Sequence, residues 1–263
     1  MNPVFTMLIS KTKNPSFVDL PYTATHFPTM PHPDYKGKTG NGLWADLLTQ
    51  IDDYTGELLD KIDDLGIADN TIFIFTADNG PEALDYGETS LTVETAMHGS
   101  AGPWRGSLFT GYEGALRVPF VMRWPGKVKA GSESDEIVHA MDLLQTIPKI
   151  KGGNVPEDRV IDGKNVWPII SGDLEAVTPH QMIFYHQSNA LKAVRSGPWK
   201  LLNGTFELYN LDEDIGESIN AAAGNPDVVE RLKGYLTIGA QAFTGDQARP
   251  AGVEDNPVAL TME

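Results

Sequence analysis

The chain has 263 residues, of which 41% are hydrophobic and 21% are charged, as in ordinary globular proteins. Its net charge of −16 argues against nucleic acid and anionic membranes as partners, because both would repel it. The absence of cysteine excludes disulfides, thiolate metal sites and cysteine nucleophiles from this chain. No stretch approaches the roughly 18 apolar residues of a membrane-spanning helix. The first residues, MNPVFTMLIS, do not show the pattern of a signal peptide, and the sequence makes no prediction of localisation.

The N-terminal part contains a predicted strand followed by an irregular loop. Residues 1–13 have no clear periodicity and are interpreted as an extension. Residues 15–22, PSFVDLPY, are predicted to form a short strand, and the prolines and glycines of ATHFPTMPHPDYKGKTGNG then forbid regular structure. This loop contains His26. It is either a surface or packing histidine, or it donates to an anionic ester oxygen or a leaving group.

An amphipathic helix is predicted next. Its apolar side chains recur at steps of three and four and share one face: Leu43, Leu47, Ile51, Tyr54, Leu58, Ile62 and Leu65. Asn41 is the expected N-cap and Gly66 the expected C-terminal stop. The strand predicted over residues 71–76 is continuously apolar, as in a parallel sheet covered by helices on both faces. Helix, tight turn and strand in this order predict an α/β fold.

The apolar strand leads directly to Asp78, Asn79 and Gly80. One interpretation is a type I′ hairpin turn, which favours Asn-Gly but needs an alternating strand on each side. The other is a ligand site, since ligands of open α/β sheets bind at the carboxyl ends of the strands. A carboxylate and an amide oxygen suit a hard cation such as Ca²⁺ or Mg²⁺, although two ligands are only part of such a site. The uniformly apolar strand favours the ligand site.

A long loop over residues 81–117 is rich in Gly, Ser and Thr, and glycines, aromatic residues and arginines occur together over residues 98–126. His98 and Arg105 are candidates for contacting an anion, because imidazolium and guanidinium groups both suit oxyanions. Glu113 is expected to anchor the loop by accepting hydrogen bonds from backbone amides. Two arginines beside strand residues are expected to form salt bridges that support the fold: Arg117 and Arg123.

The character of the sequence changes near residue 180. Before this point, a strand is predicted over residues 118–124, and a helical pattern over 137–147 is expected to stop at Pro148. After it, four short runs separated by turns predict a small antiparallel sheet: MIFYHQ, LKAVRS, WKLLN and FELYNL. PDVVERLKGYL predicts a helix with Pro226 in its first turn. The expected domains are an extension, an α/β core and a small C-terminal α+β subdomain, over residues 1–13, 14–178 and 179–263.

Several motifs together resemble the sulfatase family of the alkaline-phosphatase-like superfamily: PYTATHFP, GIADNTIFIFTADNGPE, GPWRGSLFTGYEGALRVPFVMRWPGKV, EIVHAMDLLQTI, VIDGKNVWPIISG and FELYNLDEDIGE. The resemblance implies a mixed sheet flanked by helices, followed by a small antiparallel sheet with a packed helix. It implies an arylsulfatase-like hydrolase that acts on a small anionic ester. Asp78 and Asn79 match the family's ligands for a divalent metal, usually Ca²⁺, with Mg²⁺ as an alternative. His26 matches the histidine that contacts the sulfate group.

The sequence also departs from the family pattern. Family members have a strand that ends in paired aspartates, a Cys- or Ser-containing motif whose residue is oxidised to the formylglycine nucleophile, and a Lys-x-His segment. None of these is found in this sequence, and formylglycine cannot arise here from cysteine. Leu108 stands where the family frequently has a substrate-binding lysine. We therefore expect a C-terminal portion of a sulfatase that is weak or inactive on sulfate by itself.

Three functions stay open at this stage. The first is a sulfatase-type hydrolase that carries half of the metal site and needs the other half for normal turnover. The second is a free-standing metal hydrolase that attacks phosphate or other activated esters with a metal-bound water. The third is a non-catalytic fragment that forms homo-oligomers through an uncovered sheet edge and apolar surface. Turnover and metal content separate the first two from the third, and the type of ester separates the first from the second.

Overall fold

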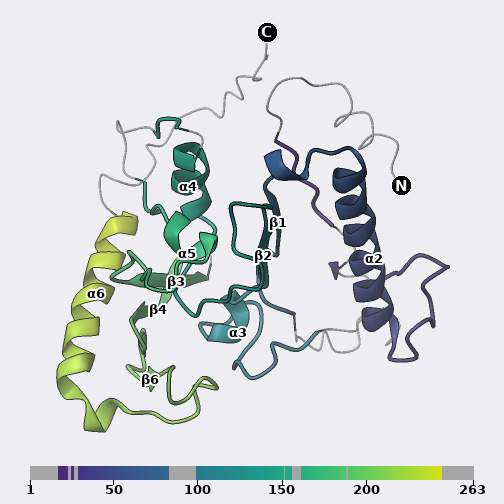
Figure 1. Cartoon of the computed structure of the whole chain (residues 1–263). Coiled ribbons are helices and arrows are strands. Elements are labelled where there is room, and N and C mark those ends of the chain that lie inside the picture. Colours follow the sequence, from purple (N-terminus) through teal and green to yellow (C-terminus); the bar gives the residue numbers. More distant parts are fainter. Residues whose placement is uncertain are drawn as a thin grey trace. The chain divides into compact units, whose positions relative to one another are not determined.

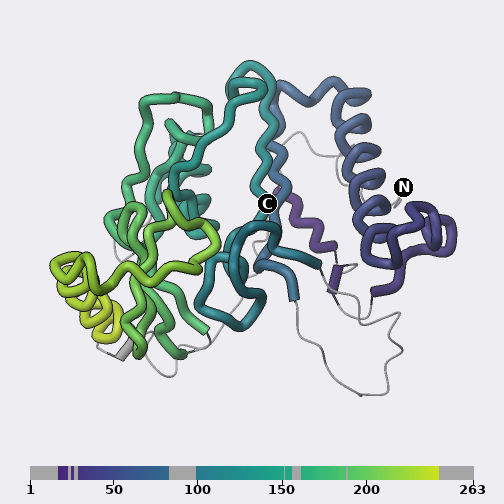
Figure 2. The backbone as a smooth tube through the Cα atoms, turned by 90° about the horizontal axis from the view of Figure 1, so that it is seen from below, coloured from purple at the N-terminus to yellow at the C-terminus, as the bar shows by residue number. Residues whose placement is uncertain are grey.

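The computed structural model describes residues 17–22, 25–26, 29–82, 99–150, 152–155, 161–187 and 189–244. These residues form two compact units, and each unit is described by itself. Unit 1 comprises the described residues of Met1–Ser100, Arg117–Asp135 and Trp167–Ala176. Unit 2 comprises those of Ala101–Leu116, Glu136–Val166 and Val177–Glu263. The chain therefore passes repeatedly from one unit to the other. Figure 2 shows the course of the backbone, coloured from purple at the N-terminus to yellow at the C-terminus. None of the described helices is long and apolar enough to cross a membrane.

Unit 1 contains five described elements, of which four are labelled in Figure 1: α2 (Leu43–Asp64), η2 (Ala68–Asn70), β1 (Phe73–Thr76), β2 (Phe120–Arg123) and α5 (Trp167–Ser171). The amphipathic pattern predicted for α2 is confirmed in part: Leu47, Ile51 and Ile62 are buried on one face, whereas Tyr54 and Leu65 of the predicted face are each 37% exposed. The helix also ends where expected. Gly66 has a φ of 66°, the left-handed conformation that glycine adopts without steric cost, and its N–H donates to the carbonyl of Asp63.

The start of α2 differs from the prediction. Gly42 occupies the N-cap position with a φ of 90°, and no side chain caps the helix, so the assignment of Asn41 as the N-cap was wrong. The preceding loop is instead held by Asp46 in the first turn. Its buried carboxylate accepts hydrogen bonds from the backbone N–H of Gly37 at 2.6 Å and from the N–H and hydroxyl of Thr39 at 2.9 and 2.7 Å.

β1 and β2 form a two-stranded antiparallel sheet within the described residues. Phe73 lies opposite Arg123, and Thr76 lies opposite Phe120. The expectation that β1 has a parallel neighbour was therefore wrong for this pair. An apolar run in the sequence indicates that a strand is covered by other parts of the protein. It does not determine whether the neighbouring strand of the sheet is parallel or antiparallel. The strand predicted over residues 15–22 is not found in its described part, because residues 17–22 have no regular structure and pair with no described strand.

Side chains connect β2 to other segments of unit 1. The guanidinium Nη2 of Arg123 lies 2.7 Å from Oδ1 of Asp63 at the end of α2, which confirms the salt bridge predicted for this arginine. The indole N–H of Trp124 donates to the carbonyl of Asp69 at 2.8 Å. Its ring centroid lies 5.8 Å from that of Trp167 in α5. These contacts position the strand pair from which Asp78 and Asn79 follow.

Unit 2 contains the following described elements: α3 (Glu113–Leu116), α4 (Asp142–Ile150), β3 (Ile183–Gln187), β4 (Ala190–Ser196), β5 (Trp199–Leu202), β6 (Leu208–Asn210), η3 (Ala222–Gly224) and α6 (Pro226–Thr244). The four strands form an antiparallel sheet in the order β3-β4-β5-β6, as the sequence predicted. The helix that begins at Pro226 is also confirmed. Pro148 does not stop α4, which continues to Ile150. The lost backbone donor affects only the last turn, and the carbonyl of Pro148 accepts from the N–H of Gly153 at 2.8 Å.

The sheet of unit 2 is covered on both faces. On one face, α6 packs Val229, Leu232 and Leu236 against three sheet residues: Val194, Leu201 and Leu208. Each of these three sheet residues has a chain neighbour (Ala193, Leu202 and Tyr209) in a second cluster, as expected from the period of two. The second cluster also contains Tyr185 and Leu211. Tyr112 packs against this second cluster. The part of the long loop around Tyr112, which belongs to unit 2, therefore lies on the sheet face opposite α6.

Candidate functional site

The predicted site residues are distributed over both units. Asp78, Asn79 and His26 belong to unit 1, whereas Arg105 belongs to unit 2. His98 lies outside the described residues, and its role stays a prediction. His26 is exposed in the short described stretch 25–26.

Asp78 and Asn79 follow β1 directly. The described partner of β1 is β2, which begins at Phe120, so Asp78-Asn79-Gly80 is not the tight turn of a hairpin between these two strands. The side-chain Nδ2 of Asn79 donates to the carbonyl of Gly80 at 2.9 Å, which leaves its amide oxygen as an acceptor. Asp78 is exposed. This carboxylate and this amide oxygen have the chemistry of hard-cation ligands.

The described residues contain no group of three or more His, Asp or Glu side chains suited to a metal ion. A Ca²⁺ ion takes about six to eight oxygen ligands. By their chemistry, Asp78 and Asn79 would supply two of these ligands.

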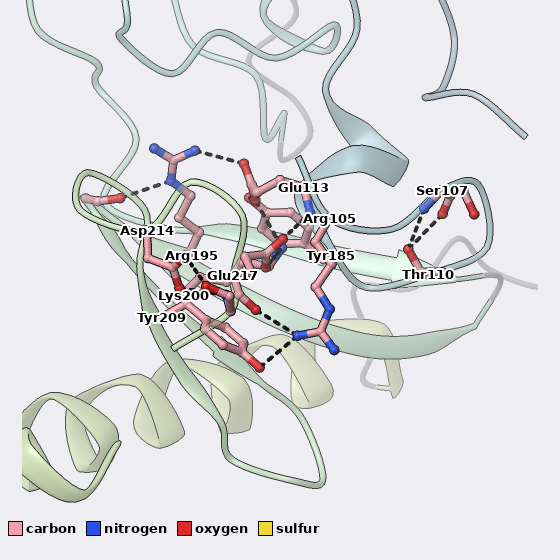
Figure 3. Close-up of polar contacts among 12 residues, drawn as sticks. Arg105, Ser107, Thr110, Glu113, Tyr185, Arg195, Lys200, Tyr209, Asp214 and Glu217 are labelled. Atoms are coloured by element: carbon pink, nitrogen blue, oxygen red, sulfur yellow. Dashed lines mark hydrogen bonds and ion pairs between the residues drawn. The ribbon is translucent and has the colours of Figure 1, made fainter. Parts of the chain in front are cut away.

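Arg105 in unit 2 is held from several directions. Its Nη1 donates to the backbone carbonyl of Glu217 at 2.7 Å and to the hydroxyl of Tyr209 at 3.3 Å (Figure 3). The guanidinium carbon lies 4.0 Å from the ring centroid of Tyr112. The carbonyl of Arg105 accepts from the N–H of Gly114 at 2.8 Å. Nε and Nη2 make no hydrogen bond to the described residues, so Arg105 presents a fixed cationic edge.

The loop beyond Arg105 is tightly folded. The hydroxyl of Thr110 donates to the carbonyl of Ser107 at 2.7 Å and accepts from its N–H at 3.3 Å. Phe109 is 54% exposed and has a φ of 70°, which is unusual for a residue other than glycine. Gly114 has no room for a side chain, because an added Cβ would lie 2.5 Å from the carbonyl oxygen of Gly106. The segment thus presents one defined backbone shape.

Glu113 anchors this loop, but through partners that the sequence did not indicate. Its buried carboxylate accepts from the hydroxyl of Tyr185 at 2.7 Å, from Nζ of Lys200 at 3.0 Å and from Nη1 of Arg195 at 3.3 Å (Figure 3). Its backbone N–H donates to Oε2 of Glu217 at 2.7 Å. The prediction of an anchoring role agrees with these contacts. The contacts found at the carboxylate come from side chains, where backbone amides were expected.

Lys200 and Glu217 are the residues that sequence analysis missed. Both are fully buried, and Lys200 Nζ lies 2.8 Å from Oε1 of Glu217. The sequence did contain a signal of the burial of Lys200. Side chains two residues apart in a strand share a face, so Lys200 in WKLL lies on the same face as the buried Leu202. Two carboxylates, Glu113 and Glu217, thus face two cations, Lys200 and Arg195, so the cluster is neutral in charge.

Burial is the largest cause of the pKa shifts of Glu217 and Tyr185. It raises the pKa of Glu217, and the nearby Lys200 and the N–H of Glu113 counteract the shift. Burial, reinforced by the charge of Glu113, also raises the pKa of Tyr185 well above its usual range. Tyr185 therefore stays a neutral hydrogen-bond donor to the Glu113 carboxylate at neutral pH.

Two protein-family models match the chain. The Sulfatase model matches residues 1–152, and the model "N-sulphoglucosamine sulphohydrolase, C-terminal" matches residues 108–237. N-acetylgalactosamine-6-O-sulfatase of Bacteroides thetaiotaomicron is 28% identical over 89% of this chain and 49% of its own length. Human N-acetylgalactosamine-6-sulfatase is 34% identical over 71% of this chain and 34% of its own length. Human steryl-sulfatase is 31% identical over 71% of this chain and 31% of its own length. The chain thus spans half or less of these curated relatives.

Solved structures agree with the family match. A structure described with the metabolism of multiple glycosaminoglycans by Bacteroides thetaiotaomicron has a TM-score of 0.76 and 29% identity, over 91% of this chain and 53% of its own. The PsFucS1 sulfatase from Pseudoalteromonas sp. has a TM-score of 0.69 over 81% of this chain and 46% of its own, and its 23% identity supports the fold alone. The Sulfatase model matches more than half of the 263 residues. The chain therefore belongs to the sulfatase family and has the α/β fold of its alkaline-phosphatase-like members.

Proposed function

We propose that this chain takes part in the hydrolysis of sulfate esters as a hydrolase of the sulfatase type. The observation that carries the proposal is the fixed guanidinium of Arg105, which has Nε and Nη2 free of hydrogen bonds to the described residues. A planar guanidinium with an open edge suits the oxygens of a sulfate monoester. Membership of the family supplies the reaction class. Relatives named for steryl and N-acetylgalactosamine-6 sulfates support an organic sulfate ester as the substrate.

The other site residues have roles that fit this reaction. Asp78 and Asn79 would hold a divalent cation, with Ca²⁺ expected from the family. Such a cation supplies positive charge that stabilises the ester oxygens. His26 would donate to an ester oxygen or to the leaving group, and His98 and Arg105 are each candidates for contacting the anion.

The chain on its own is expected to be slow. Its 263 residues include no cysteine, so it cannot itself carry a formylglycine derived from cysteine. Covalent catalysis divides a difficult displacement into two easier steps, and that advantage is lost without the nucleophile. Leu108, at a position where the family frequently has a lysine, adds no positive charge. We infer sulfate release several orders of magnitude slower than in a sulfatase that carries the nucleophile.

A second candidate function follows from the same ligands. Asp78 and Asn79 would hold a divalent cation, and the chemistry that such a cation would supply is an activated water for the hydrolysis of a phosphate or another activated ester. This chemistry needs no formylglycine. The absence of cysteine together with two hard-cation ligands is the observation that favours it.

We also infer that the protein self-associates. Val121 of β2 is 60% exposed, and β1 and β2 have no further partner strand among the described residues. Open edges and exposed apolar side chains favour pairing with a second copy of the chain. Light scattering of the purified chain should show a homo-oligomer, and a monomer at all concentrations would contradict the inference.

An activity assay tests the main proposal. The purified chain would be assayed with nitrophenyl sulfate and nitrophenyl phosphate, with added Ca²⁺ and with a chelator. We expect slow sulfate release that needs the cation and falls in Arg105→Gln, Asp78→Ala and His26→Ala. Arg231→Gln is the matched control, because this exposed arginine lies on α6 of unit 2. Rapid sulfate release without metal, unaffected by all these substitutions, would contradict the proposal. Faster phosphate release would favour the second candidate.

A further inference from the structure

Lys200 connects the two residues that hold the Arg105 segment. Its Nζ lies 3.0 Å from Oε1 of Glu113 and 2.8 Å from Oε1 of Glu217, and 4.3 Å from the ring centroid of Tyr185. Figure 3 shows these side chains converging on the lysine from different segments. The ammonium group is completely buried.

The contacts continue from Lys200 to Arg105 along two routes. On the first, the backbone carbonyl of Glu217 accepts the hydrogen bond from Nη1 of Arg105. On the second, Glu113 begins the short helix α3, whose next residue, Gly114, donates to the carbonyl of Arg105. Oε2 of Glu217 also accepts the N–H of Glu113, so the two routes are joined. The side chain and the backbone of Arg105 therefore depend on a pair of carboxylates bridged by one lysine.

A buried ion pair is by itself weak evidence of a stabilising role. Replacing a buried ion pair by apolar side chains of similar volume is often neutral or stabilising. Glu217 additionally has a φ of 50°, a conformation that costs free energy outside glycine and persists only where the surroundings enforce it. In this conformation, the carboxylate of Glu217 lies beside Lys200 and its backbone carbonyl accepts the hydrogen bond from Arg105. The arrangement favours a geometric role over a stabilising one.

We propose that Lys200 is a positioning residue that, through Glu113 and Glu217, fixes the guanidinium of Arg105 with its Nε and Nη2 edge available to an anion. The anion-binding role of Arg105 rests on the proposed function. The bridging role of Lys200 can be tested without it.

The test uses single cysteines as sites for a nitroxide label, because the chain contains no other cysteine. One label is placed by Phe109→Cys in the Arg105 loop, where the side chain is 54% exposed. A reference label is placed by Ile238→Cys on α6, where the side chain is 50% exposed.

Each label is examined by electron paramagnetic resonance in an otherwise unchanged chain, in Lys200→Met and in the double variant Lys200→Met, Glu217→Gln. The double variant removes one cation and one anion, so it leaves no buried excess charge. Lys233→Met is the control, because it removes a surface cation from α6.

We expect the label at position 109 to become more mobile in both Lys200 variants, with the label at 238 and the Lys233→Met spectra unchanged. If the double variant restores the original spectrum at 109, Lys200 only neutralises charge and the proposal is overturned. The label at 238 shows whether Lys200→Met unfolds unit 2. If it does, the spectrum of the double variant at position 109 decides whether Lys200 has the positioning role. An unchanged spectrum at 109 in both variants also overturns the proposal.

A binding measurement connects this result to the proposed function. The affinity for inorganic sulfate should fall at least about tenfold in the double variant, as in Arg105→Gln, and should be unchanged in Lys233→Met. If the original chain binds no sulfate, the proposed role of Arg105 fails and the label spectra still decide on Lys200. If the chain binds sulfate and the double variant binds it equally well, the inferred link between Lys200 and Arg105 is wrong.

Discussion

Arg105 donates a hydrogen bond from Nη1 to the backbone carbonyl of Glu217 at 2.7 Å, across 112 residues of sequence. Because the acceptor belongs to the backbone, no substitution of the Glu217 side chain removes it directly. The arginine is thereby fixed to the segment that follows β6, while its remaining donors have no hydrogen-bond partner among the described residues. The consequences of this contact can be measured.

The fork of the guanidinium should be required at position 105. Arg105→Lys keeps the charge but cannot donate to Glu217 and Tyr209 and at the same time offer a planar pair of donors to an anion. We expect affinity for inorganic sulfate, measured by calorimetry, to fall by about tenfold or more, since hydrogen bonds to charged groups contribute about 1.5–3 kcal/mol. Arg231→Lys on α6 should bind as the original chain does. Equal affinity of Arg105→Lys and the original chain would exclude a role for the fork.

Two glycines of unit 2 should respond in opposite ways to alanine. In Gly114→Ala the new Cβ would lie 2.5 Å from the carbonyl oxygen of Gly106 and 2.6 Å from that of Arg105, so the loop must shift. We expect a loss of about 1–3 kcal/mol in the free energy of unfolding, as in other overpacked sites. Gly234→Ala meets no atom within 4 Å inside α6 and should gain about 0.5–1 kcal/mol. Urea denaturation measures both, and a Gly114→Ala variant as stable as the original would show that the loop is adaptable.

Asp46 should make unit 1 sensitive to acid. Hydrogen bonds from the backbone and hydroxyl of Thr39 and from the N–H of Gly37 lower the pKa of Asp46 from its ordinary value of 3.8. A pKa that is lower in the folded protein than in the unfolded chain means that folding stabilises the ionised carboxylate of Asp46. The resulting stability is present above about pH 4 and is lost as the pH falls through the folded pKa.

Melting temperatures at about pH 5 and about pH 3 test this expectation. Asp46→Asn should lower the melting temperature at the higher pH and reduce the difference between the two values. Asp52→Asn, at an exposed position of the same helix, should keep the original difference. If Asp46→Asn retains the full acid sensitivity, other carboxylates are responsible for it.

Calcium should bind weakly to this chain. Asp78 and Asn79 provide two of the about six to eight oxygen ligands that Ca²⁺ takes. We expect a dissociation constant above about 10⁻⁶ M by calorimetry, and no measurable binding in Asp78→Ala. Asp52→Ala on α2 is the control for the loss of one exposed carboxylate. Tighter binding that Asp78→Ala abolishes would show that further ligands complete the shell.

The sequence determined the elements whose signals are local. Steps of three and four predicted α2, and Gly66 predicted its end, because side chains one helical turn apart share a face and glycine adopts a left-handed φ without strain. Short alternating runs separated by turns predicted β3 to β6, whose neighbours in sequence are also neighbours in the sheet. The ordered motifs were sufficient to predict the family.

The tertiary structure decided everything that depends on residues far apart in the chain. The direction of β2 beside β1 and the burial of Lys200 between Glu113 and Glu217 are of this kind. Lys200 lies 87 residues from Glu113, and the N–H of Glu113 meets a carboxylate 104 residues away. No local period encodes such pairs. Whether a charged side chain is solvated or buried against a counter-charge is determined only when the folded chain brings the two together, because the energy of an ion depends on its surroundings more than on its neighbours in sequence.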